Sequence, residues 1–546
     1  MLLRFLVFYS LLTVSSAHAR QLELGNIDFP TSGSGQAQAH FLRGVAALHS
    51  FWYPVALEEF RAASQADPNF MMAYWGEAMA HDHPIWGDAQ ETEAAREVIA
   101  KIRITPELTL RERAYIDAAK RLYGEGDRQA RDHAYAEGME KIYREYPHDL
   151  EAAAFYALAL LGSVEPQDPA ALQTRMRAGA IAMEIYGKEP NHPGAVHYIL
   201  HAFDDPNHAI LALPAAKRYA EIAPDSPHAL HMPAHIFLQL GMWEEAVKSN
   251  EASWAASKKW VEQSDLSIAK RDYHSLHWLL YTYLQQGRYD DAEALLKLMR
   301  KSIAEGPQED PVFQGYGTFI YASMASAFVI ETGRWELADK LFAPLQENTA
   351  LRAAAEKPGP FQALAKYVQA LVIFTPGFSA GKRGSPDAQK GITELQAMRE
   401  HAGKEVVPNL GMSLSSLLEI QRLEIAATAS AAKGDLSEAI TALQEATAVE
   451  ASIEPSPGPP PLIKPANELL GEILLLAKQP KEAGEQFEIA LLRHEDRVHA
   501  LIGAARASAR SGNHEVAADA YAEYVNQWQG DPSVLAEARD YLTHVR

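Results

Sequence analysis

Histidines are concentrated in one part of the chain. Nine of the 21 histidines fall within residues 192–277, where an even distribution would place about three. Side chains three or four residues apart share one face of a helix, so their ring nitrogens can converge on one metal ion. The pairs with this spacing are His197 with His201, His231 with His235, and His274 with His277.

Clustered imidazoles are typical of a transition-metal site. Zn²⁺ takes three or four such ligands, with water in any open position, and Cu²⁺ is the alternative in an oxidising compartment. The same rings could instead bind a polar ligand, cap helices or pack on aromatic side chains. We predict that a divalent metal, Zn or Cu, is held by His197, His201, His231, His235 and His277.

The elements that must position these histidines are paired helices. Stretches of about 14 residues with helical periodicity end at Gly or a polar turn, and a second helix follows. The set Gly44, Ala56, Phe60, Ala63 and Pro68 resembles the tetratricopeptide repeat (TPR) consensus, a 34-residue helix–turn–helix. Sustained β-type alternation is nearly absent from the sequence. The resemblance implies an all-α, TPR-type α-solenoid.

The repeat frame gives the histidines matching places. Alanines that pack the second helix of each repeat are expected at Ala246, Ala292, Ala338, Ala439, Ala483 and Ala517. In that frame the histidine pairs fall on the first helices of three neighbouring repeats. TPR proteins line their concave groove with these first-helix positions. The resemblance therefore implies that three adjacent helices direct histidines into one groove.

Two shorter motifs resemble a narrower group. The run from His192 to His201 reads H-P-x3-H-Y-x2-H, and the run from His228 to His235 reads H-x2-H-M-P-x-H. Both are similar to motifs of bacterial exported TPR-like proteins. The resemblance implies a dedicated site and no particular activity. Pro233 leaves two alternatives for His228 and His231, a kinked helix or a loop.

Other side chains could complete the site. Asp204 and Asp205 share the helix of His201; they either end that helix as a solvated pair or act as ligands, partners of an imidazole or a general base. The segment around His81 and His83 is either an exposed loop or a second arm of the site. The additional candidate ligands are His192, His228, His274, Tyr281, Asp204, Asp205, Glu77, His81 and His83.

Composition excludes several functions. The formal charge of −21 opposes nucleic-acid binding. With no cysteine, the chain cannot form disulfides, Fe–S clusters or a thiol nucleophile. Phosphate-binding loops, dinucleotide fingerprints, H-E-x-x-H and nucleophile elbows are also absent from the sequence.

The sequence divides into five segments. Residues 1–19 have the basic start, apolar stretch and Ala17-His18-Ala19 end of a secretory signal, so we expect cleavage after Ala19, a periplasmic or secreted protein and no stable membrane anchor. Residues 20–36 are expected as a flexible lead, 37–375 as a TPR-like solenoid with the histidine-rich groove, 376–390 as a loop, and 391–546 as further TPR repeats.

Three functions fit these observations. The groove could bind a divalent metal or a polar ligand. It could be a scaffold that binds a peptide or protein partner without metal, or it could hold the metal of a histidine-ligated metalloenzyme. Nothing in the sequence decides whether a reaction is catalysed.

Overall fold

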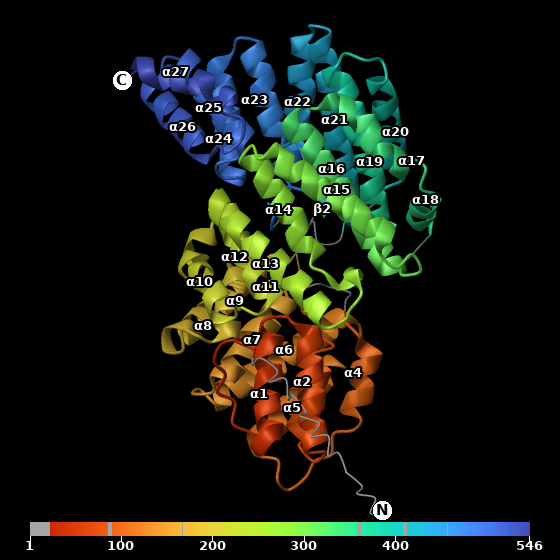
Figure 1. Ribbon diagram of the computed structural model, residues 1–546, viewed down its shortest axis with the longest axis vertical. Coiled ribbons are helices and arrows are strands. Elements are labelled where there is room, and N and C mark those ends of the chain that lie inside the picture. Colours follow the sequence, from red (N-terminus) through yellow and green to blue (C-terminus); the bar gives the residue numbers. More distant parts are fainter. Residues whose placement is uncertain are drawn as a thin grey trace, which may run out of the picture.

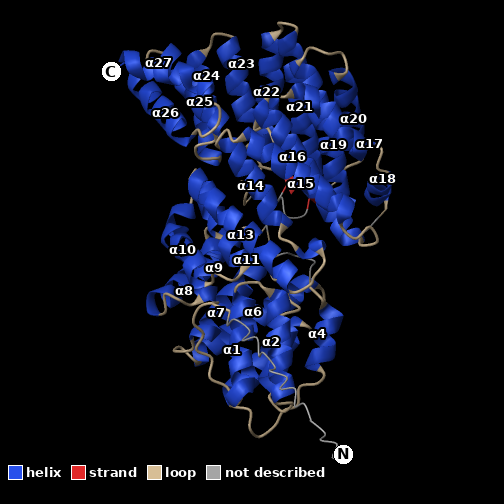
Figure 2. Ribbon diagram, viewed as in Figure 1, coloured by secondary structure: helices blue, strands red, loops and turns tan. Residues whose placement is uncertain are grey.

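The protein is built almost entirely from helices (Figure 2). The computed structural model describes residues 22–85, 90–165, 168–357, 362–403, 405–407, 412–455 and 457–545. Within these residues the β structure is a two-stranded antiparallel ribbon of β1 (Val406–Val407) and β2 (Met412–Ser413). No helix among them is both long enough and apolar enough to cross a membrane. The expected signal, residues 1–19, lies outside the described residues.

The N-terminal helices form one end of an elongated molecule (Figure 1). They are α1 (Gly35–His49), α2 (Tyr53–Ala66), α3 (Met71–Met79), α4 (Thr92–Ile99), α5 (Leu110–Leu122), α6 (Arg128–Glu145) and α7 (Leu150–Gly162). Small residues let the pairs approach closely: a Cβ added to Gly44 or to Gly76 would collide with the ring of Phe60. This is the small-against-large packing that the repeat pattern predicts.

The middle helices hold the histidines. They are α8 (Ala171–Lys188), α9 (Pro193–Ala202), α10 (Ala209–Ile222), α11 (Pro227–His231), α12 (Pro233–Gln239), α13 (Trp243–Gln263), the 3₁₀ turn η2 (Ile268–Lys270) and α14 (Tyr273–Gln285). Polar caps begin several of them: Ser226 accepts the Ala229 N–H, and Asp272 accepts the Ser275 N–H. These caps fix where α11 and α14 begin.

The next helices complete the far end of the molecule (Figure 1). They are α15 (Tyr289–Glu305), α16 (Pro311–Thr332), η3 (Trp335–Leu337), α17 (Ala338–Gln346), α18 (Thr349–Glu356), α19 (Gln362–Lys382), α20 (Ala388–Glu400), α21 (Leu414–Ala432) and α22 (Leu436–Glu450). The six alanines expected at the helix contacts, from Ala246 to Ala517, are all fully buried.

The C-terminal helices return to the middle of the chain. They are α23 (Ala466–Leu476), α24 (Pro480–Arg493), α25 (Val498–Arg510), α26 (His514–Gln527), η4 (Pro532–Leu535) and α27 (Ala536–Val545). The Trp243 indole N–H donates to the Asp496 carbonyl at 3.1 Å, and the Gln529 N–H donates to the Gln286 carbonyl at 2.8 Å. In Figure 1 the C-terminal helices, coloured blue, lie at the far end of the molecule, and these two contacts join them to the start of α13 and the end of α14.

Two segment predictions are wrong. Residues 376–390 were expected as a loop, but α19 runs to Lys382 and α20 begins at Ala388. The small residues of this stretch serve helix packing: a Cβ on Gly377 would lie 2.8 Å from Ile425, and one on Gly381 would lie 2.2 Å from Thr428. Gly377 and Gly381 thus allow α19 to approach α21 instead of forming a turn.

The described part of the predicted flexible lead is also ordered by packing. Phe29 is 1% exposed and its ring lies 5.0 Å from Tyr115 and 5.3 Å from Phe41, between centroids. The Ser32 N–H donates to Glu112 at 2.7 Å. The ring of Phe29 and the Ser32 hydrogen bond hold residues 22–34 against the first repeats. The Gly and Ser content of this segment predicts flexibility, but the buried aromatic ring outweighs it.

Pro233 does not unfold the helix that carries His228. Met232 keeps a helical backbone, with φ −53° and ψ −35°, between the end of α11 at His231 and the start of α12 at Pro233. Proline is tolerated in the first turn because its missing N–H would have no helical partner there. His228 and His231 therefore lie on helix, not in a loop.

Candidate metal centre

Three histidines from two repeats form the first triad: His197 and His201 on α9, and His228 on α11. The Nε2 atom of His197 lies 3.0 Å from Nε2 of His201 and 3.1 Å from Nε2 of His228. His197 is fully buried, whereas His201 and His228 are half-buried. Three imidazole nitrogens thus point at one another.

A second triad lies on the following helices: His231 on α11, His235 on α12 and His274 on α14. The Nε2 atoms of His231 and His235 are 3.1 Å apart, and the ring of His274 lies 4.7 Å from that of His231 between centroids. His231 is fully buried and His235 is 7% exposed. The i, i+4 pair persists across the α11–α12 junction because the backbone stays helical at Met232.

Hydrogen bonds fix the tautomers of the second triad. His235 Nδ1 lies 2.5 Å from the Asp204 carboxylate, which can only accept, so Nδ1 carries the proton. His231 Nδ1 lies 2.7 Å from Asn250 Oδ1, and the Asn250 amide nitrogen donates to the Ala246 carbonyl. His231 is held neutral by burial, with a donor on Nδ1, so it presents an unprotonated Nε2 toward Nε2 of His235.

The lone pair on Nε2 of His231 lies 3.1 Å from Nε2 of His235. A shared proton or a cation is needed to make the contact favourable. Nitrogens bound at about 2.0–2.1 Å to a tetrahedral ion lie about 3.3 Å apart. The second triad is therefore close to the spacing of metal-bound imidazoles.

The first triad has one tautomer fixed in the same way. His197 Nδ1 lies 2.7 Å from the His49 carbonyl oxygen, so this nitrogen donates and Nε2 is unprotonated. Partners of this kind, a carbonyl here and an amide and a carboxylate in the second triad, commonly orient metal-binding imidazoles. The protein thus holds three of the six rings with their Nε2 atoms directed inward.

Burial keeps five of the six rings neutral. Desolvation lowers the pKa of His197 to about 3, assisted by neighbouring histidines. Burial and then the other histidine rings lower the pKa of His201, His228 and His231 well below 6.5. The same two causes hold the pKa of His274 well below 6.5. Neutral imidazole is the form that binds a metal.

Each triad has an aromatic cover. Phe51 lies 4.3 Å from the ring of His197, 5.7 Å from His201 and 5.6 Å from His228, between centroids. Its φ of 51° is in the left-handed region, which is strained for a bulky residue. Trp278 lies 4.1 Å from His235, 4.9 Å from His231 and 5.3 Å from His274.

A third group of similar composition is the His49–Glu151–His192 network. His49 Nε2 lies 2.8 Å from Glu151, and His192 Nε2 lies 3.2 Å from the same carboxylate. His192 Nδ1 accepts the Ala195 N–H and caps α9, while His49 Nδ1 contacts the Tyr198 hydroxyl at 2.7 Å. Burial alone would raise the pKa of Glu151, but His192 and His49 lower it to about 2. Every ring nitrogen here has a complementary partner.

The structure places the predicted ligands as follows. It brings His197 and His201 together in one group and His231 and His235 together in the other, rather than all around one point. His228 and His274, two of the additional candidates, complete the groups. His277 is in neither; its ring lies 6.4 Å from Phe319 and faces a pocket closed by Pro459–Pro461. Tyr281 accepts a hydrogen bond from Arg497 at 3.0 Å.

The acidic candidates take different roles. Asp204 is 4% exposed and binds His235 and the Gln239 amide, so it orients an imidazole rather than ending a helix in solvent. Asp205 forms an ion pair with Arg175 and contacts His208. Sequence gave no signal for Asn250, whose helix α13 follows α12 and returns along it.

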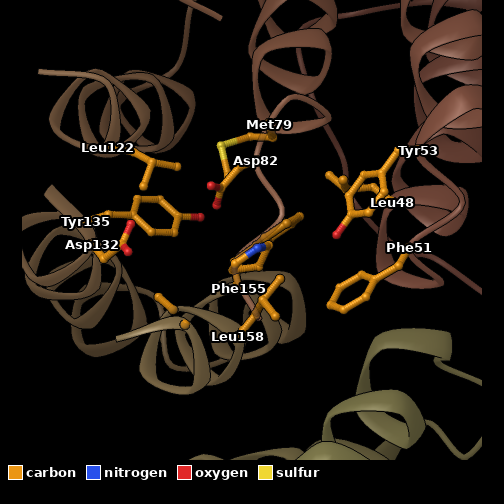
Figure 3. Close-up of a pocket in the computed structure, with 13 residues that line it drawn as sticks. Leu48, Phe51, Tyr53, Met79, Asp82, Leu122, Asp132, Tyr135, Phe155 and Leu158 are labelled. Carbon is orange, nitrogen blue, oxygen red and sulfur yellow. The ribbon is translucent and has the colours of Figure 1, made fainter. Parts of the chain in front are cut away.

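The predicted second arm borders a pocket instead. Glu77 pairs with Arg61 at 2.7 Å, His81 contacts Glu91 at 2.6 Å, and His83 packs 4.1 Å from the Tyr53 ring. Their neighbours Asp82 and Pro84 line a pocket of about 420 Å³ together with Phe51, Tyr53, Tyr135 and Phe155 among others (Figure 3). Phe51 therefore separates this pocket from the first triad.

Comparisons with known proteins bear on the repeats. Residues 470–532 match the sequence model of the family described as tetratricopeptide repeat. No curated protein matches the chain. The structure of Naa15/Naa10 bound to HypK-THB is 12% identical, covers 93% of this chain and 74% of its own, and has a TM-score of 0.24. The structure of the P58(IPK) TPR domain is 14% identical. The match covers 73% of this chain and 97% of that domain, with a TM-score of 0.23.

The helix pairs and the matched C-terminal repeats define an all-α solenoid of the TPR type. Solenoids of this class present extended concave surfaces that bind other proteins. The two histidine triads are a further feature of this chain, built into the contact between consecutive repeats.

Proposed function

We propose that the protein binds transition-metal ions, Zn²⁺ or Cu²⁺, through its two histidine triads. One observation carries the proposal: the partners on Nδ1 direct the Nε2 atoms of His231 and His235 at each other, and these atoms lie 3.1 Å apart. Such a buried contact is unfavourable unless a proton or a cation lies between the two nitrogens. A metal ion satisfies all three inward nitrogens of a triad at once.

Metal content and heat stability test this proposal. The wild-type protein, purified gently and then dialysed against Zn²⁺ or Cu²⁺, should retain metal and unfold at a higher temperature, because an ion that binds the native state stabilises it by mass action. Fewer than about 0.1 ion per chain with no change in unfolding temperature would contradict it.

A matched pair of variants localises the binding. His201→Ala combined with His274→Ala removes one half-buried ligand from each triad, and we expect both the metal and the heat-stability gain to be lost. His277→Ala removes a histidine one turn from His274, on the same helix, that belongs to neither triad. This control should keep the metal; equal loss in both variants would place the binding elsewhere.

A scaffold for a peptide partner is the second candidate. Its support is the chain's own proline-rich connector: Pro459–Pro461 close a pocket with His277, Phe319 and Tyr367, and the Tyr367 hydroxyl donates to the Pro461 carbonyl at 3.2 Å. An extended proline-rich segment thus fits between α14, α16 and α19. A synthetic peptide of residues 455–464 should bind a variant whose connector is replaced by Gly-Ser repeats; no binding would remove this candidate.

We further propose that the protein is exported in bacteria, as the secretory pattern of residues 1–19 and the two histidine motifs indicate. Expression of the full chain followed by periplasmic extraction and intact-mass measurement should give a protein that begins at Arg20. Recovery of the uncleaved chain in the cytoplasm would contradict export without affecting the metal proposal.

A further inference from the structure

We infer that the two triads form one binuclear centre, in which two metal ions share a small anionic ligand such as hydroxide. The inference rests on the proposed metal binding. It goes further because two separate mononuclear sites would satisfy that proposal equally well. The evidence is the way in which the six rings are interleaved along the chain.

The two triads are joined through one helix. His228 and His231 are one turn apart on α11, yet they belong to different triads. Their ring centroids are 6.3 Å apart, and those of His201 and His235 are 6.1 Å apart. Within the triads, the longest separations are 6.4 Å, for His201 and His228, and 6.2 Å, for His235 and His274. These two pairs of rings from different triads are therefore about as close as the most distant pair within each triad.

One aromatic side chain packs on each triad. Phe51 packs on all three rings of the first triad and Trp278 on all three rings of the second. Three imidazoles leave a four-coordinate ion one open position. Because an aromatic side chain covers each triad, a ligand between the triads can fill both open positions.

The chemistry of such a centre selects the ligand. Two divalent ions held only by neutral imidazoles carry four positive charges in a buried site. The Asp204 carboxylate beside His235 offsets one of them. In two-ion centres the ions lie about 3.5–4 Å apart, a separation that one oxygen or a diatomic anion can bridge. A small anion would lower the charge and occupy both open positions.

Copper is a suitable probe whichever metal the protein carries in the cell. The apo-protein is titrated with Cu²⁺ and followed by metal analysis and by electron paramagnetic resonance. We expect about two Cu²⁺ per chain and a resonance signal that integrates to clearly less than the bound copper, because ions that share a ligand are magnetically coupled. His274→Ala should bind about one Cu²⁺ in the first triad, with the signal fully restored.

The outcomes separate the two proposals. No bound copper contradicts metal binding itself. One ion per chain, or two ions whose signal accounts for all the copper, leaves metal binding intact and overturns the binuclear centre. His277→Ala should behave as the wild type, because it leaves all six rings in place.

Azide, a small bridging anion, tests the shared ligand directly. Titrated into the copper-loaded wild type, it should saturate at one azide per two ions. In copper-loaded His274→Ala it should saturate at one azide per ion. Two azides per pair of ions in the wild type would overturn the shared ligand.

Discussion

The His49–Glu151–His192 network and the second triad have similar composition and opposite chemistry. Each contains buried imidazoles with ring nitrogens close together. In the network, the carboxylate of Glu151 accepts from His192, whose other nitrogen accepts a backbone N–H. In the second triad, the outer nitrogens of His231 and His235 donate to Asn250 and Asp204, so the inner nitrogens face each other rather than a carboxylate.

This difference shows that the partners on the far side of each ring decide its role. A ring N–H directed into the cluster forms a hydrogen-bonded structural network. A ring nitrogen that directs its lone pair into the cluster can bind a metal ion. The network also supports the first triad, because the carbonyl of His49 sets the tautomer of His197. A structural cluster and a candidate metal centre thus meet at one residue.

Removing the carboxylate of the structural network should have the largest effect on stability. Glu151→Ala leaves the buried N–H groups of His49 and His192 without an acceptor and creates a cavity. We expect a loss of about 2–5 kcal/mol in the free energy of unfolding, measured by urea denaturation of the apo-protein. His274→Ala, which removes a ring without such a partner, should cost less. Equal losses would mean that the two clusters do not differ as their hydrogen bonds indicate.

The pH dependence of that loss sharpens the comparison. The pKa of Glu151 is lowered from 4.5 to about 2 by His192 and His49, against the effect of burial. The stability contributed by the carboxylate is therefore complete above pH 4.5 and is lost as the pH falls toward 2. The difference in unfolding free energy between wild type and Glu151→Gln should shrink over that window. A difference that grows on acidification would reverse the sign of the inferred shift.

Removing the carboxylate that orients His235 should have a smaller effect. It should weaken metal binding more than it lowers the stability of the fold. Asp204→Ala frees the His235 ring, and we expect the metal affinity of the second triad to fall about 10–100-fold in a competition titration with a chelator. The matched control is Asp205→Ala, the next residue, which pairs with Arg175 and His208 instead. An equal fall in the control would show that the helix end, and not the imidazole contact, controls affinity.

The sequence predicted the helices and the histidine groups better than the exact ligand sets. The i, i+4 spacing brought His197 with His201 and His231 with His235, as helix geometry requires. His274 and His277 lie one turn apart on α14, so their spacing makes both possible ligands. Only the packing of α14 against α11 and α12 places His274, and not His277, in the second triad. Such a choice depends on helix rotation, which spacing within one helix does not fix.

Tertiary contacts explain the other differences. Asn250 lies 19 residues after His231 and has no motif, yet it orients that ring because α13 packs back along α11. Residues 376–390 have the composition of a loop, but Gly377 and Gly381 lie where α19 packs closely against α21. Composition predicts turns where glycine supplies backbone freedom, and it fails where glycine supplies room for a neighbour.

The smallest expected effect concerns Gly458, which directly precedes Pro459–Pro461 in the proline-rich connector and lies against Trp278. Gly458 has a φ of 88°, and a Cβ there would lie 2.3 Å from the Trp278 ring, which itself packs on His235. Gly458→Ala should cost about 1 kcal/mol in backbone strain and move the connector off Trp278. We expect the second triad to lose its metal to a chelator a few times faster, with little change at the first triad. Gly434→Ala is the matched control, because its φ of 87° imposes similar strain and nothing lies within 4 Å of the added Cβ. Faster loss from both triads, or in both variants, would mean that general loosening and not the cover over the second triad controls release.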